Sequence, residues 1–168
     1  MDSKLHEEIN VQINKELYSG YLYLSMAAYF DSQSLSGYAH WMKMQAQEEF
    51  LHANKFMDHL NDRGCRIILQ AIDQPDVDFE SVKDVFEKTL AHEKFVTSRI
   101  NMLYKLASDL NDNAAKIMLE WFVTEQVEEE KNPSEILDKI VFLKEDPMSM
   151  LMLDKELMAR PAPQTAAA

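Results

Sequence analysis

Apolar residues recur at every third or fourth position over four long segments of this 168-residue chain, which is the period of an amphipathic helix. The pattern predicts helices over about residues 4–32, 38–63 and 80–108, and a fourth helix that begins near Ala114. A short fifth helix is expected after Asp146-Pro147, because proline is favoured in the first turn of a helix. The chain is therefore predicted to be all-α.

The connections between these helices indicate how they are arranged. Gly37 marks a short turn after the first helix, and residues 109–113 form another before the fourth. Residues 65–79 show no sustained helical period and are long for a link between close antiparallel neighbours. This rhythm predicts a four-helix bundle with one long crossover and a short fifth C-terminal helix. We expect this single domain to span residues 1–159 and residues 160–168 to form a disordered tail.

Pro133 presents a conflict between local and global patterns. Residues 132–135, Asn-Pro-Ser-Glu, form a good helix start, with an Asn cap and proline in the first turn. The apolar stripe nevertheless keeps its period across the proline. We therefore predict that the fourth helix continues through Pro133 with a kink. The stripe residues are Phe122, Gln126, Glu129, Pro133, Ile136 and Ile140.

Each of the four long helices carries a carboxylate near the middle of its apolar stripe. No lysine or arginine lies on the stripes close to them. Several buried, ionised and unpaired carboxylates would be very costly, and a bound cation would supply the missing charge. Oxygen donors with one imidazole suit iron or manganese better than a metal that prefers thiolates. The candidate ligands are Glu16, Glu49, His52, Glu93 and Glu129.

The spacing of two of these residues strengthens the metal hypothesis. Glu49 and His52 form a Glu-x-x-His pair on one face of the second helix. Single glutamates from two helices combined with Glu-x-x-His are the pattern of di-iron carboxylate bundles. Any one of these glutamates, taken alone, is more often a solvated surface residue. The five together favour a metal centre.

Several stretches of the sequence resemble the haem-free ferritins of bacteria and archaea. They are KELYS at 15–19, QAQEEFLHA at 45–53, HE at 92–93, WFVTEQVEEE at 121–130 and LDKEL at 153–157. The resemblance covers nearly the whole chain except the tail, with the motifs in the same order and spacing. It implies a ferritin-like four-helix bundle.

The resemblance also implies a two-iron ferroxidase centre. Glu16, Glu49 and His52 would hold the first iron. Glu49 would bridge to a second iron, which Glu93 and Glu129 would also hold.

Further residues take supporting roles by the same resemblance. Gln126 would hydrogen-bond beside the centre, and Tyr23 would take part in electron transfer. A third and weaker iron position would lie on the inner surface, although glutamates spaced like Glu125 and Glu128 are also common on solvated faces. The ligands of this third position would be Glu48, Glu125 and Glu128, with help from Glu129.

Two departures from related families bear on the cofactor. Bacterioferritins carry a second Glu-x-x-His on the fourth helix, where this chain has Gln126 and Glu129. They also bind haem through a methionine just after the ligand glutamate of the second helix, where Phe50 stands here. We therefore expect iron and no haem. The mini-ferritins that coat DNA place their ligands between subunits and fit less well.

Charge and hydropathy limit the possible partners. Asp and Glu number 29 against 17 Lys and Arg, a net charge of −12 that disfavours nucleic acid and anionic membranes as partners. The longest uncharged apolar stretch, 17–30, falls short of the ~20 residues of a spanning helix. With a single cysteine, Cys65, and a charged start, the chain is expected to be cytoplasmic.

The resemblance implies an iron-storage ferroxidase that oxidises Fe(II) with O2 or H2O2 and deposits ferric mineral inside a homo-oligomeric, 24-subunit cage. The first helix is apolar on nearly every face, with Tyr18, Tyr21 and Tyr29 off its core stripe, which favours subunit contacts. One alternative is a rubrerythrin-like di-iron enzyme that reduces peroxide without large-scale storage, although the chain has no Cys-x-x-Cys module. A helical interaction protein without metal is the other alternative.

Overall fold

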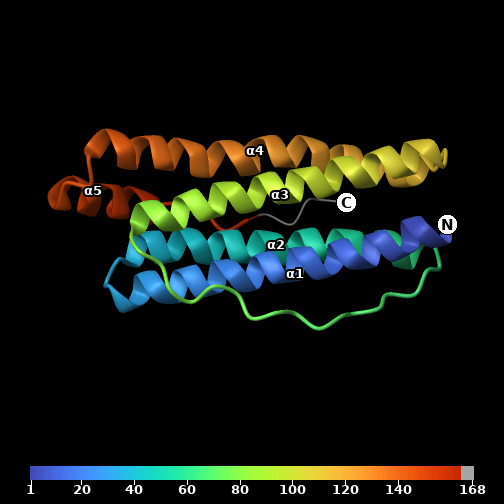
Figure 1. Cartoon of the computed structure of the whole chain (residues 1–168), viewed down its shortest axis with the longest axis horizontal. Helices are drawn as coiled ribbons and strands as arrows, with labels where there is room; N and C mark the ends of the chain where they lie inside the picture. Colours follow the sequence, from blue (N-terminus) through green and yellow to red (C-terminus); the bar gives the residue numbers. More distant parts are fainter. Residues whose placement is uncertain (164–168) are drawn as a thin grey trace.

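The computed structural model describes residues 1–163, and its regular elements are all helices, as predicted. Four long helices lie side by side and a short fifth packs at one end of the bundle (Figure 1). The all-α four-helix bundle with a short fifth C-terminal helix is thus confirmed. The helices are α1 (Ser3–Ser32), α2 (Ser36–Asp62), α3 (Val82–Asp109), α4 (Asn113–Leu143) and α5 (Pro147–Leu157).

The long crossover between α2 and α3 is also confirmed. It runs in extended form along the outside of the bundle beside α1, from one end to the other (Figure 1). Side chains of α1 hold its backbone: Asn14 Nδ2 donates to the carbonyl of Ala71 at 3.0 Å, and Ser25 Oγ donates to that of Asp76 at 2.6 Å. The crossover therefore connects helices that run in the same direction.

The helix starts are capped in two different ways. The cap residue of α2, Leu35, has no side-chain acceptor. In its place, the Asp154 carboxylate of α5 accepts hydrogen bonds from the backbone N–H groups of Gly37 and Tyr38 at 2.8 and 2.9 Å. The short fifth helix thus completes the start of the second. The other four helices have local caps, which are Asp2, Ser81, Asp112 and Asp146.

The fourth helix runs without interruption through Pro133. Pro133 is buried, as are Phe122 before it and Ile136 and Ile140 after it. The predicted continuation is confirmed, because burial of one stripe on both sides of the proline outweighs the local tendency to start a new helix. The kink stays a prediction.

The expected disordered tail begins at Arg160 and stays a prediction. The Arg160 guanidinium bonds to the Trp41 carbonyl at 3.2 Å and to Glu48 at 2.5 Å, so the first residue of that stretch contacts α2. Its part at 164–168 lies outside the described residues.

The apolar core consists of two clusters. One contains Phe30, Tyr38 and Phe86, and the other contains Phe56 and Leu119 among its members. On every long helix, buried polar residues stand in sequence between the members of the two clusters. The bundle therefore has a buried polar layer in its middle. Within the described part of the chain, no helix is long and apolar enough to cross a membrane.

Candidate metal centre

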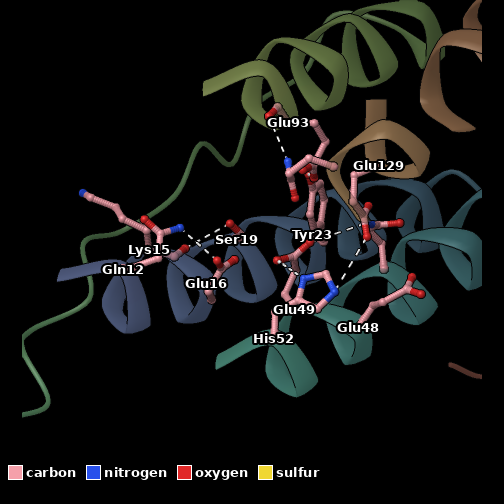
Figure 2. A network of polar contacts seen from close by, with 12 residues as sticks. Gln12, Lys15, Glu16, Ser19, Tyr23, Glu48, Glu49, His52, Glu93 and Glu129 are labelled. Atoms are coloured by element: carbon pink, nitrogen blue, oxygen red, sulfur yellow. Dashed lines mark hydrogen bonds and ion pairs between the residues drawn. The ribbon is translucent and has the colours of Figure 1, made fainter. Parts of the chain in front are cut away.

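The polar layer brings together all five predicted ligands. Glu16 comes from α1, Glu49 and His52 from α2, Glu93 from α3 and Glu129 from α4. None of them is more than 4% exposed. Figure 2 shows these side chains converging on one region between the helices. The apolar stripes place the residues correctly because their helical period fixes which face turns inward.

The ligand atoms form two overlapping groups. In the first, Glu16, Glu49 and His52 each offer one atom, and these atoms lie within 4.8 Å of one another. Glu49, Glu93 and Glu129 form the second group by the same measure. Glu49 therefore belongs to both groups, and its carboxylate lies between the other residues of each.

Burial makes these carboxylates poor acids. It is the largest cause that raises the pKa of Glu16 from 4.5 to about 8, followed by the negative charge of Glu49. Burial and the charge of Glu93 raise the pKa of Glu129 to about 8 as well. The pKa values of Glu49 and Glu93 are also raised well above 4.5, mainly by burial. Without a cation, the centre therefore favours protonated carboxylates.

The protein itself supplies little compensating charge. Among the described residues, no lysine or arginine forms an ion pair with these four glutamates, and only His52 lies near, 3.4 Å from Glu49 and 3.9 Å from Glu129. The Oε2 atom of Glu16 is fully buried and has no hydrogen-bond partner. A buried acceptor without a donor is costly, and a metal ion at this point would satisfy it.

Two glutamines orient the ligands, and the sequence reasoning did not assign them. Gln12 Nε2 donates to Glu16 at 2.9 Å, and Gln45 donates to Glu49 at 3.4 Å and also to Glu129. Each glutamine stands four residues before its glutamate on the same helix. The shared Gln-x-x-x-Glu spacing was a signal that could have found both.

The supporting residues named from the sequence also lie in this layer. The hydroxyl of Tyr23 donates to Glu93, so the tyrosine contacts a ligand directly. Burial, and then the charge of Glu93, raises the pKa of Tyr23 well above 10 and keeps the phenol protonated. Gln126 donates to the backbone carbonyl of Glu93 at 3.3 Å and to Thr97 at 3.1 Å, and it thereby ties α4 to α3 beside the centre.

The residues named for a third position are only partly brought together. Glu125 forms a further close group with His52 and Glu129, with ligand atoms within 4.8 Å of one another. Glu48 is half-buried and engaged by Arg160. Glu128 is exposed, although its charge contributes to the raised pKa of Glu125. Figure 2 shows Glu48 at the side of the centre near Glu129.

The fold and this centre define the class to which the protein belongs: helical bundles with a buried, carboxylate-rich metal-binding site. The family model of the ferritin-like domain matches residues 6–142, and the chain belongs to the ferritin family. The resemblance inferred from the motifs is confirmed.

Individual relatives agree with this assignment. The chain is 38% identical over 160 residues to a protein of Staphylococcus epidermidis named "Bacterial non-heme ferritin", covering 95% of this chain and 96% of the relative. It is 42% identical over 149 residues to a "Probable bacterial non-heme ferritin-like protein" of Haemophilus influenzae, with coverage of 89% and 90%. Among solved structures, the open pore ferritin of Archaeoglobus fulgidus superimposes with a TM-score of 0.95 at 44% identity, covering 96% of this chain and 99% of that one.

Proposed function

We propose that this chain is an iron-storage ferroxidase, which oxidises Fe(II) at two neighbouring positions and stores the ferric product in a homo-oligomeric cage. The observation that carries the proposal is the sharing of Glu49 between two buried three-ligand groups. Glu16 and His52 complete one iron position, and Glu93 and Glu129 complete the other. The names of the bacterial relatives support iron storage as the wider role.

The ligand chemistry supports oxidation at such a centre. Carboxylate oxygens are hard donors, which favour Fe(III) over Fe(II). Two Fe(II) ions held side by side supply the two electrons that reduce O2 to H2O2, or that reduce H2O2 to water. The protein's part is to place both irons, to keep Glu49 between them and to hold the carboxylates through Gln12 and Gln45.

Two supporting roles belong to the proposal. The Tyr23 hydroxyl donates a hydrogen bond to Glu93 and stays protonated at neutral pH, so Tyr23 can give up an electron while this proton passes to Glu93. Gln126 fixes the spacing of α3 and α4 at the centre. Glu48, Glu125, Glu128 and Glu129 form the third, weaker iron position.

The assembly is part of the same proposal. A homo-oligomeric cage of 24 subunits encloses the mineral, and the protein acts in the cytoplasm with O2 or H2O2 as oxidant. Two structural neighbours from Archaeoglobus fulgidus are an open pore ferritin and an engineered closed form of ferritin, which supports an enclosing assembly.

Aerobic addition of Fe(II) to the purified protein tests the oxidation. We expect a transient ferric absorbance that Glu49→Ala and His52→Ala both suppress, because each substitution removes a ligand. Glu7→Ala, which removes an exposed glutamate of α1, is the matched control and should leave the rate unchanged. Unchanged rates in both ligand variants would contradict the proposal. The rubrerythrin-like alternative predicts peroxide consumption without iron retained on the protein, and gel filtration of the iron-loaded protein distinguishes the two.

A further inference from the structure

The segment that follows α5 returns along α2 and is fixed there by Arg160. The carbonyl of Arg160 accepts a hydrogen bond from His40 Nε2 at 2.8 Å, and its Nη1 donates to the carbonyl of Trp41 at 3.2 Å. The guanidinium also lies over the Trp41 ring, 4.3 Å from the ring centroid. These three contacts are enough to hold the arginine in place.

A fourth contact connects Arg160 to the acidic residues beside the metal centre. Nη2 of Arg160 lies 2.5 Å from Oε2 of Glu48, and the two side chains are 17% and 24% exposed. Glu48 immediately precedes the bridging residue Glu49, and its charge helps to raise the pKa values of Glu125 and Glu129. The arginine therefore places a positive charge on a carboxylate whose own charge acts on Glu125 and Glu129.

The other acidic residues of the third position have no such partner. Among the ion pairs of the described residues, Glu48 is bound by Arg160, while none involves Glu125 or Glu128. Lys55 acts on Glu125 through its charge alone and lies 4.5 Å from the ring centroid of Trp121. Apart from the His52 imidazole, 3.9 Å from Glu129, the basic side chain of the described residues in direct contact with this group of glutamates is thus Arg160.

We infer that Arg160 is a positioning residue that competes with iron for the carboxylate of Glu48 and so keeps the third iron position weak. The inference deepens the proposed function and rests on it. A guanidinium stays charged at every physiological pH, so it repels a cation that shares its carboxylate. Both side chains are partly buried, which limits screening by salt. Iron at Glu48 would therefore have to share that carboxylate with a guanidinium that Trp41 holds beside it.

Metal titration without oxygen tests this inference independently of oxidation. Zn(II), which has no redox chemistry, is titrated into the assembled wild-type protein and into Arg160→Gln by calorimetry. We expect the binding at the paired positions to be unchanged, and the third binding event to tighten roughly tenfold in Arg160→Gln because a neighbouring cation is lost. Glu48→Gln should remove the third event in both backgrounds. Arg160→Lys, which keeps the charge, should stay close to wild type.

Arg63→Gln is the matched control. Arg63 forms an ion pair of similar burial with Asp112, with 2.9 Å between the charged atoms, at the end of the bundle. The Arg63→Gln variant should leave all the Zn(II) binding events unchanged. An unchanged third event in Arg160→Gln, or an equal change in Arg63→Gln, would overturn the inference and make Arg160 only an anchor of the chain end. Failure of the wild-type protein to oxidise Fe(II) would instead contradict the proposed function, while the Zn(II) titration would still decide the role of Arg160.

Discussion

At the scale of single residues, the central feature is a set of carboxylates held where they cannot easily ionise. Burial raises the pKa of Glu16 and of Glu129 to about 8, and the neighbouring glutamates reinforce the effect. Such residues make the metal-free bundle hold protons that a metal ion would displace. The pH dependence of metal binding follows directly.

Metal binding should therefore release protons at neutral pH. At pH 7 Glu16 and Glu129 are mostly protonated without metal, because their pKa values of about 8 lie above the pH. Metal affinity should rise as the pH increases from 7 through about 8, since the ligands must be deprotonated. Calorimetry of Zn(II) binding at pH 7, in two buffers of different ionisation enthalpy, measures the protons released. We expect more than one proton for each bound pair and fewer in Glu16→Gln, and a value of zero in wild type would contradict the pKa assignment.

At the scale of helices, α5 acts as the cap of α2. The backbone of Gly37 comes so close to α5 that an added Cβ would lie 1.6 Å from the carbonyl oxygen of Asp154. Glycine is needed there because any side chain would push the two helices apart. The Asp154 carboxylate then lies at the positive end of α2 and satisfies two of its free N–H groups.

Asp154→Ala should destabilise the protein by about 1–3 kcal/mol, because it leaves two buried backbone donors without an acceptor. Asp146→Ala also removes a helix cap, but the hydrogen bond that Asp146 accepts from the Ser149 backbone N–H is exposed. A loss of at most about 1 kcal/mol in the free energy of unfolding is therefore expected. Thermal and urea unfolding of the two variants compare the effects. Equal losses in both would show that the contact between α5 and α2 contributes nothing beyond a local cap.

At the scale of the whole molecule, the apolar surface of α1 is smaller than the sequence suggested. Tyr18 and Tyr29 pack within the subunit, Tyr29 with its ring centroid 5.2 Å from that of Phe79 in the crossover. Tyr21 is 48% exposed and Leu24 is 42% exposed. Together with Ile72 and Val77 of the crossover, they line a groove on the outside of the bundle. This face supports the homo-oligomer proposed above.

Leu24→Glu should weaken subunit association, because a charge would be buried if copies of the chain meet at this face. Light scattering after gel filtration should show smaller species than in wild type. Leu24→Met, which keeps the volume and apolar character, should assemble normally. Assembly of Leu24→Glu identical to that of wild type would place the subunit contacts elsewhere.

The buried polar layer could be predicted from the sequence because its residues lie on regular helices. Once the stripes are assigned, the period places Glu16, Glu49, Glu93 and Glu129 on inward faces, and the spacing to His52 adds the imidazole. The crossover could be predicted too, because its length excludes a tight turn. Gln12 and Gln45 were within reach of the same reasoning, since each acts over a single helical turn.

The sequence by itself therefore determined the helices, their connections and the residues that face the buried centre, because all of these follow from local periodicity and spacing. Only the tertiary structure decided the contacts between distant segments. Asp154 meets Gly37 across 117 positions of the chain, and Arg160 meets Glu48 across 112. Such pairs depend on where α5 docks against α2, and docking is fixed by packing and backbone hydrogen bonds that no local pattern encodes.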